Sequence, residues 1–273
     1  MSDDRAARPP LDATRLRELS TSVRPGAPPF AVEVVAATGS TNADVAARAR
    51  AGAAEGLVVV AEHQQAGRGR LDRRWETPDR AALTFSVLLR PPADAPSWTW
   101  LPLLAGVAVA SAVTELGIAA DLKWPNDVLV GERKLAGLLV ERMETPDGPA
   151  AVVGIGLNVS QTGDELPVAE ATSMSLEGAD VDRTFLLEVI LLRLGEAYAD
   201  WLCPGGVAAL RAAYTERCGT VRGHRVRVSM PGGSVVEGEG AGLSADGGLL
   251  VWSSAGVVTV NAGDVVHVRP AEG

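Results

Sequence analysis

The length and spacing of the apolar runs change once along the chain, near Cys218. This change constrains the possible folds more than any other feature of the sequence. From Phe30 onward, apolar runs of strand length alternate with helical patterns. Beyond Cys218 the apolar runs are short, alternate with polar residues and are separated by glycine-rich turns such as Ala245-Asp246-Gly247-Gly248. The sequence therefore predicts an N-terminal extension at residues 1–29, an α+β domain at residues 30–217 and a small all-β barrel of about SH3 size at residues 218–273.

The expected elements follow from the spacing of apolar residues and from turn residues. Strands are predicted at Ala31–Ala37, Leu57–Glu62, Ala82–Leu89 and Ala151–Gly156, a hairpin at Asp127–Val130 and Lys134–Met143, helices at Asn42–Ala53, Trp100–Leu116, Phe185–Trp201 and Val207–Arg217, and barrel strands at Arg225–Ser229, Ser234–Glu239, Leu249–Ser253 and Val257–Val260. Ser40 or Thr41 is expected to cap the first of these helices. A further helical pattern, Leu11–Leu19, is too short for a DNA-reading domain with its own core.

The net charge and the length of the apolar runs argue against nucleic acid and membranes as partners. The chain has a net charge of -9 and a pI near 4.9, which makes nucleic acid a poor partner. The first residues lack the apolar core of a signal peptide, and the longest apolar stretch, Leu101 to Val113, is shorter than the roughly 20 residues that cross a bilayer. We therefore expect a cytoplasmic protein that binds no membrane.

Cysteine and histidine are too sparse to predict a metal site. Cys203 and Cys218 have neither the density of a disulfide framework nor CxxC spacing, and both are interpreted as packing residues. His63, His224 and His267 are scattered along the chain. No metal held by the protein's own side chains is expected.

The segment from Glu62 to Trp75 concentrates arginine and glycine right after the apolar run Leu57–Val60. Gly67-Arg68-Gly69-Arg70 is followed by two more arginines and the tryptophan. Guanidinium groups suit phosphate and carboxylate oxygens, and glycines let backbone N–H groups approach such oxygens closely. A charge run is more often a solvated surface. However, an acidic chain that gathers four arginines beside a tryptophan favours a local anion site.

Two further motifs carry polar groups that suit ligand binding. Lys123-Trp124-Pro125-Asn126-Asp127, with Lys134 after the hairpin turn, offers two point charges and an amide that both donates and accepts. The alternative is a plain turn before a strand. Ser40, Thr41 and Asn42 stand between a strand and a helix, where they either bind a neutral polar group such as a urea or only cap the helix. Spacing alone decides neither question.

The glycine-rich segment Gly154-Ile155-Gly156-Leu157-Asn158 is not a dinucleotide-binding motif. It lacks the third glycine of that fingerprint and does not open a strand–helix–strand unit, so NAD binding is rejected. The chain also has no Gly-x-x-x-x-Gly-Lys-[Ser/Thr] sequence. Any nucleotide phosphates are therefore held by something other than a P-loop.

Taken together, five motifs closely resemble those of the biotin protein ligases in their order and separation. The motifs are Ser40-Thr41-Asn42, Glu62 to Arg70, Lys123 to Asp127, Lys134 to Gly137 and Gly154 to Asn158. The resemblance covers roughly residues 30–270, including the C-terminal β module. It implies an α+β fold with a mixed sheet and flanking helices, similar to class II aminoacyl-tRNA synthetases, followed by an SH3-like β-barrel.

The resemblance implies a two-step reaction. Biotin and ATP, with Mg²⁺ carried on the nucleotide, give biotinyl-5′-AMP and pyrophosphate. A lysine of a biotin carboxyl carrier domain of an acyl-CoA carboxylase then takes the biotinyl group. Residues 1–29 are too short for the DNA-binding domain that some family members carry, so a monofunctional ligase is expected.

The same resemblance assigns residues to roles. Biotin binding is expected at Ser40, Thr41, Asn42, Gln64, Arg68, Gly69, Arg70 and Lys134. ATP binding is expected at Arg70, Arg73, Trp75, Asn126, Lys134 and Asn158. Attack of a carboxylate on the α-phosphate brings two anions together, so the catalytic residues are expected to be the cations Arg68, Arg70 and Lys134.

Two other functions remain open from the sequence. A lipoate or octanoyl ligase shares the fold class, and a non-enzymatic sensor of biotin or a nucleotide would use the same pocket without turnover. Transfer of labelled biotin to a carrier lysine separates the three possibilities.

Overall fold

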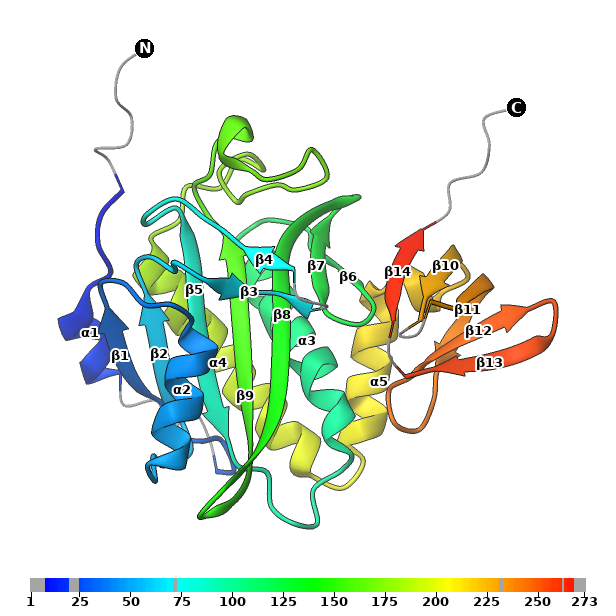
Figure 1. The fold of residues 1–273 in the computed structure, drawn as a ribbon, viewed down its shortest axis with the longest axis horizontal. Coiled ribbons are helices and arrows are strands. Elements are labelled where there is room, and N and C mark those ends of the chain that lie inside the picture. Colours follow the sequence, from blue (N-terminus) through cyan, green and yellow to red (C-terminus); the bar gives the residue numbers. More distant parts are fainter. Residues whose placement is uncertain (1–7, 20–24, 71–72, 231–232, 262, 268–273) are drawn as a thin grey trace.

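A seven-stranded mixed sheet organises the larger part of the computed structural model, which describes residues 8–19, 25–70, 73–230, 233–261 and 263–267 (Figure 1). The strand order is β1 (Ala31–Val35), β2 (Leu57–Ala61), β5 (Ala82–Leu89), β9 (Gly148–Asn158), β8 (Arg133–Thr145), β7 (Asp127–Val130) and β6 (Asp121–Lys123). Strands β1 and β2 pair in parallel, and every other neighbouring pair is antiparallel. The expected α+β class with a mixed sheet is confirmed.

Helices cover both faces of this sheet. Helix α2 (Thr41–Arg50) packs on one face, and α3 (Leu101–Glu115), α4 (Arg183–Leu202) and α5 (Gly206–Arg217) lie on the other (Figure 1). Along β9, Val152 belongs to the cluster under α2 and Val153 to the cluster under α3. Because both faces are covered, β2 and β5 are buried at every position, which explains their continuous apolar sequences.

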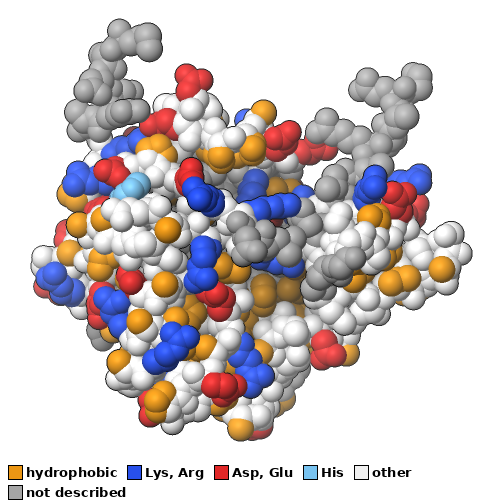
Figure 2. Space-filling model, in the orientation of Figure 1, with side chains coloured by type: hydrophobic (Ala, Val, Ile, Leu, Met, Phe, Trp, Pro, Cys, Tyr) orange, Lys and Arg blue, Asp and Glu red, His pale blue; other side chains and the backbone are white. Residues whose placement is uncertain are grey.

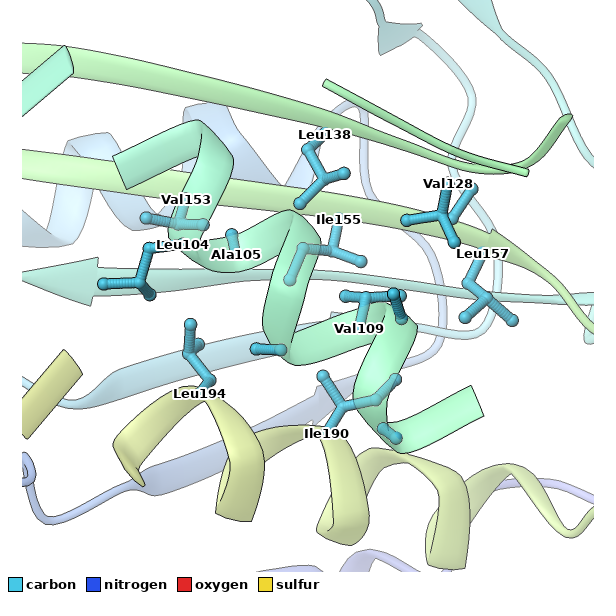
Figure 3. Close-up of a cluster of buried hydrophobic side chains, with 14 of the residues drawn as sticks. Leu104, Ala105, Val109, Val128, Leu138, Val153, Ile155, Leu157, Ile190 and Leu194 are labelled. Carbon is cyan, nitrogen blue, oxygen red and sulfur yellow. The ribbon is translucent and has the colours of Figure 1, made fainter. Parts of the chain in front are cut away.

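Helix α3 forms the centre of the main core. Its residues Leu104 and Val109 lie between Ile155 of the sheet and Ile190 of α4 (Figure 3). A helix that is apolar on all sides must be buried on all sides. The segment Trp98–Glu115 has the length and composition of a membrane span, but 67% of it is buried inside the protein, so the core accounts for its apolar character.

The C-terminal strands form a separate small sheet that packs against α3 and α5. Its order is β13 (Gly256–Val260), β12 (Leu249–Ser253), β11 (Val235–Leu243), β10 (Arg225–Ser229) and β14 (Asp264–His267). Two indoles of the larger domain donate to its 245–247 turn: Trp100 Nε1 to the Ala245 carbonyl and Trp124 Nε1 to the Gly247 carbonyl, both at 3.0 Å. The predicted small β module is confirmed, and Trp124 anchors it.

The N-terminal segment is fastened to the larger domain near the start of the arginine-rich loop. Leu16 of helix α1 (Ala13–Glu18) is fully buried in the main core. The Glu62 carboxylate accepts the Leu11 N–H at 2.6 Å and pairs with Arg183 at 2.7 Å. Arg183 also donates to the Pro9 carbonyl. The described part of this segment is therefore a short helix packed on the larger domain.

Several predicted elements needed adjustment. Strand β5 and the β7–β8 hairpin lie where predicted, but β9 is longer than the predicted Ala151–Gly156 because it pairs with β8 along ten positions. Helix α2 begins at Thr41, and Ser40 is its N-cap without a side-chain hydrogen bond to the helix. The segment around Arg68 is a short hairpin of β3 (Gly67–Arg68) and β4 (Arg74–Trp75), which the sequence did not predict.

The interpretation of both cysteines as packing residues was wrong for one of them. Cys203 is exposed because it lies in the turn that joins α4 to α5. Cys218 is buried, and burial raises the pKa of its thiol. Only Cys218 therefore contributes to packing.

Candidate active site

One cavity of about 690 Å³ opens over β8 and β9, between the start of α2 and the β3–β4 hairpin. Every residue to which the resemblance assigned biotin or ATP binding lines it: Ser40, Thr41, Asn42, Gln64, Arg68, Gly69, Arg70, Arg73, Trp75, Asn126, Lys134 and Asn158. In Figure 2, Lys and Arg side chains gather around the hollow at the centre of the face shown. Arg68 and Lys134, which come from distant parts of the chain, therefore share one cavity.

The inner end of the cavity is a buried pocket of neutral polar groups. Ser40, Thr41, Asn42 and Gln64 are each exposed by 7% or less. The side-chain carbonyl of Gln64 accepts the Thr41 backbone N–H at 2.8 Å, which ties the first turn of α2 to the loop that follows β2. Polar groups with so little exposure are costly unless they are hydrogen-bonded, so their arrangement is specific.

Two side chains outside the predicted set complete this pocket. Ser86 Oγ of β5, fully buried, lies 2.7 Å from Thr41 Oγ1 and 2.6 Å from Asn42 Oδ1. The amide nitrogen of Asn42 donates to Glu141 of β8 at 2.7 Å. Ser86 was missed because it stands in an apolar strand. The only available signal was a pair of hydroxyl residues, Thr84 and Ser86, on a buried strand.

Glycines on β8 and β9 make the floor of the cavity flat. Gly137 and Gly156 are direct partners across the two strands, and the Trp75 indole lies over them. A Cβ atom at Gly156 would stand 2.4 Å from Trp75 Cε2, and one at Gly154 would stand 2.1 Å from Asn42 Oδ1. Both separations are far below van der Waals contact, so only glycine leaves room for these two side chains.

The outer end of the cavity is cationic and more exposed. The Arg68 side chain is 54% exposed, and its guanidinium lies 3.6 Å from the Glu141 carboxylate. Arg70 donates to Asn126 Oδ1 and to the Gly263 carbonyl, both at 3.2 Å, so the hairpin also contacts the C-terminal module. Arg73 and Arg74 line the same opening. Four guanidinium groups converge on one end of the cavity.

Lys134 lies on the floor between the two ends. Its ammonium group is 2.6 Å from the Asp127 carboxylate and 5.9 Å from the centre of the Trp75 ring. Backbone hydrogen bonds join Lys134 to Glu170 and Thr172, which fixes the strand beneath the side chain. Asp127 therefore holds the ammonium group in a defined position, a role that the sequence did not assign.

Two sequence expectations are modified by this geometry. Lys123, proposed with Lys134 as a charge near the ligand, does not line the cavity. Asn158 does line it, but its side chain donates to the Thr172 carbonyl and accepts from Gln161. The geometry thus gives Asn158 a second task, which is to hold the segment that carries Thr172 against the floor.

The fold and the cavity together define a class of site. A neutral, buried pocket suits a small polar ring, and the adjoining cations suit a carboxylate and phosphates. Among the described residues, no group of three or more His, Cys, Asp or Glu side chains could hold a metal ion. Such a cavity is suited to joining an acid to a nucleotide.

Comparison with known proteins agrees with this class. Residues 36–158 match the Biotin/lipoate A/B protein ligase family, and residues 222–268 match the Biotin protein ligase C terminal domain. The chain is 40% identical over 276 residues to the biotin--[acetyl-CoA-carboxylase] ligase of Mycobacterium tuberculosis, which covers 98% of this chain and 100% of that protein. The chain belongs to the biotin protein ligase family.

Two other relatives extend the comparison. The bifunctional ligase/repressor BirA of Bacillus spizizenii is 34% identical over 221 residues, which cover 78% of this chain and 66% of that protein. The structure of the Aquifex aeolicus biotin protein ligase in complex with biotin and ATP is 30% identical, with a TM-score of 0.73, and the similarity covers 88% of this chain and 99% of that one.

Proposed function

We propose that the chain is an ATP-dependent biotin protein ligase that forms biotinyl-5′-AMP and transfers the biotinyl group to a lysine of a biotin carboxyl carrier domain. One observation carries the proposal: a single cavity joins a buried neutral pocket to a cluster of arginines, with Lys134 where the two meet. The names of the relatives, a biotin ligase with ATP and biotin bound and a biotin--[acetyl-CoA-carboxylase] ligase, support the substrates.

In this proposal, the buried pocket binds the bicyclic ring of biotin. Ser40, Thr41, Asn42 and Gln64 provide hydroxyl and amide groups that match the N–H and C=O groups of a cyclic urea. The valeryl chain then runs beside the Trp75 indole, which covers Gly137 and Gly156, and places its carboxylate near Lys134. The ring is held where water is excluded, so each hydrogen bond contributes to specificity.

In the first half-reaction, a biotin carboxylate oxygen attacks the α-phosphorus of ATP. A new P–O bond forms and the bond to pyrophosphate breaks, with no proton to transfer because the nucleophile is already ionised. Arg68, Arg70 and Lys134 offset the negative charge that accumulates, while Asp127 keeps Lys134 in place. Fixed cations in a partly closed cavity stabilise this charge without reorganising.

The nucleotide occupies the outer end in this proposal. Trp75 provides a flat surface for adenine, and Arg73, Asn126 and Asn158 lie around the phosphates. Among the residues that the structure describes, the acidic ones that line the cavity are Glu76 and Asp127, and Asp127 already pairs with Lys134. Mg²⁺ therefore fits this donor set best as an ion that arrives on the triphosphate, where it neutralises phosphate charge.

In the second half-reaction, the amine of the carrier lysine attacks the acyl carbon, an amide bond forms and AMP leaves. The ammonium group of this lysine must lose one proton to a base or to water before it attacks, and its nitrogen loses a second proton as the amide forms. We place this reaction in the cytoplasm, as expected from the sequence. Action without a DNA partner stays a prediction that a gel-shift assay can check.

A carrier-labelling assay tests the proposal directly. Purified protein is mixed with labelled biotin, ATP, Mg²⁺ and an isolated carrier domain, and pyrophosphate release and labelled carrier are measured. Both products are expected, and a carrier whose acceptor lysine is replaced by arginine should stay unlabelled. Transfer of lipoate or octanoate in place of biotin would assign the rival ligase activity. Binding of biotin without either product would indicate a sensor.

A further inference from the structure

A chain of hydrogen bonds connects Glu141 to the buried pocket through Asn42, Ser86 and Thr41. Resting on the proposed function, we infer that this relay fixes the donor and acceptor pattern of the pocket and makes Glu141 and Ser86 positioning residues for the cyclic urea of biotin. Neither side chain lines the cavity, so both act through Thr41 and Asn42.

The relay begins with a group that can only accept. A carboxylate has no proton to donate, so the Asn42 atom 2.7 Å from Glu141 must be the NH₂ group. The Leu139 carbonyl, 3.4 Å from the same nitrogen, also requires a donor there. Asn42 Oδ1 is therefore turned toward Ser86, and Gly154 leaves the space that this orientation needs.

The number of available protons then determines which way the Ser86 and Thr41 hydroxyls donate. The Ser86 hydroxyl carries one proton but lies close to two oxygens, and Asn42 Oδ1, at 2.6 Å, can only accept. The Ser86 proton therefore goes to Asn42. The 2.7 Å contact between Ser86 and Thr41 needs a proton as well, and Thr41 has one to give.

The Thr41 hydroxyl has therefore already used its proton, and it can only accept a hydrogen bond from a group in the cavity. The other neighbour of the Thr41 hydroxyl is Gln64 Oε1, at 3.1 Å, which is also an acceptor and already accepts the Thr41 backbone N–H. In either arrangement the Thr41 proton stays within the protein, and its oxygen accepts from the ligand. A ring N–H of a urea satisfies this oxygen, whereas a ring oxygen or a dithiolane sulfur opposes it.

Glu141 also joins the pocket to the arginine hairpin. One of its oxygens takes the Asn42 amide, and the other lies 3.6 Å from Arg68. Replacement by glutamine would let the amide of residue 141 donate, so Asn42 could turn over. Ser86 would then donate to Thr41, so the Thr41 proton would be divided between Gln64 Oε1 and the ligand, and the Thr41 oxygen would no longer be a fixed acceptor.

The test measures discrimination between ligands as well as affinity. Binding of biotin and of its two cyclic carbamate analogues, each with oxygen in place of one ring N–H, is measured by calorimetry for the parent and for Glu141→Gln and Ser86→Ala. We expect each variant to bind biotin about tenfold or more weakly, the typical effect of one hydrogen bond to a charged group. The preference for biotin over the worse carbamate should narrow by a similar factor.

A matched control and a double variant sharpen the result. Glu144→Gln makes the same charge change on the same strand at a side chain that is 73% exposed, and it should leave both affinity and preference unchanged. Because Glu141 and Ser86 belong to one relay, the double variant should lose little more affinity than the more damaging single variant. Thermal unfolding of each protein checks that the pocket still folds.

Two outcomes would overturn the inference. If the variants weaken all three ligands equally, Glu141 acts only through Arg68 or through general packing. If biotin affinity is unchanged, the relay does not control the pocket. Failure of the parent protein to bind biotin would instead contradict the proposed function itself, so the two failures are distinguishable.

Discussion

The two ends of the cavity are built in opposite ways. At the inner end Thr41 is 2% exposed and is hydrogen-bonded to Gln64, from the loop after β2, and to Ser86 of β5. At the outer end the Arg68 side chain is 54% exposed and that of Arg74 84% exposed, on a hairpin of only two residues per strand. The first end is fixed before a ligand arrives, whereas at the second end the Arg68 and Arg74 side chains lie largely in solvent.

This difference separates recognition from charge stabilisation. Buried, fully bonded groups discriminate between ligands because an unmatched group there loses its hydrogen bonds altogether. Exposed guanidinium groups attract any anion and gain strength only when water is excluded from around them. Lys134 combines features of both ends: it carries a charge, like the arginines, but Asp127 holds it in a fixed position, like the groups of the inner end.

The largest effect is expected from removing this central cation. Lys134→Ala should slow formation of biotinyl-5′-AMP by about 100-fold or more, the usual loss when one preorganised group at a developing charge is deleted. Single-turnover pyrophosphate release measures the rate. Affinity for biotin should change far less, since the ring is held at the other end.

The chain provides a natural control for this variant. Lys123 is its only other lysine and lies outside the cavity, so Lys123→Ala should retain the parent rate. Equal losses in the two lysine variants would mean that total charge matters and that the position of Lys134 does not.

A smaller effect is expected at the outer end. Arg68→Ala should speed the release of biotinyl-5′-AMP by about 10- to 100-fold, as expected for loss of hydrogen bonds to a charged group. Stopped-flow release of the intermediate measures it, with Arg50→Ala on the exposed side of α2 as a control. An unchanged release rate would show that Arg68 does not hold the intermediate, while folding should be unaffected because Arg68 is exposed.

The outer end was predictable from sequence and the relay beneath the inner end was not. Four arginines with two glycines in ten residues form a local cluster that indicates an anion site on its own. Ser86 and Glu141 stand 55 positions apart on different strands, and neither has an unusual neighbour in sequence. Their link depends on the register in which Gly154 faces Leu139, which the sequence does not reveal.

Sequence alone also could not decide which of Lys123 and Lys134 lies at the cavity. Both lie close to the Trp-Pro-Asn-Asp segment in sequence and looked equivalent as charges near a ligand. The pairing of β7 with both β6 and β8 places one at the cavity and the other beyond it. Helix and strand types were predicted well because they depend on local periodicity, whereas these positions depend on tertiary pairing.

An effect smaller than that of Arg68→Ala is expected where the Trp75 ring of the hairpin packs on Gly156 of the cavity floor. Gly156→Ala would put a methyl group 2.4 Å from the Trp75 ring, so the indole must shift. We expect ATP affinity to fall by about tenfold and the free energy of unfolding to fall by about 1–3 kcal/mol, the range for overpacking. Calorimetry and denaturant unfolding measure the two. Gly163→Ala, which meets no atom within 4 Å, is the control. Normal ATP binding would show that the nucleotide does not depend on the position of the Trp75 ring over Gly156.

The smallest effect should come from salt, and it tests the comparison without a mutation. Raising ionic strength from about 0.05 to 0.5 M shortens the screening length several-fold, so exposed charges lose attraction while buried hydrogen bonds do not. The Kd for a non-hydrolysable ATP analogue at constant Mg²⁺ should rise roughly three- to fivefold. The Kd for biotin amide, which keeps the ring but has no charge, should change less than about twofold, because the inner groups are 7% exposed or less. Equal salt dependence for both ligands would mean that the inner pocket is held together by the cations of the hairpin, and that the two ends are not independent.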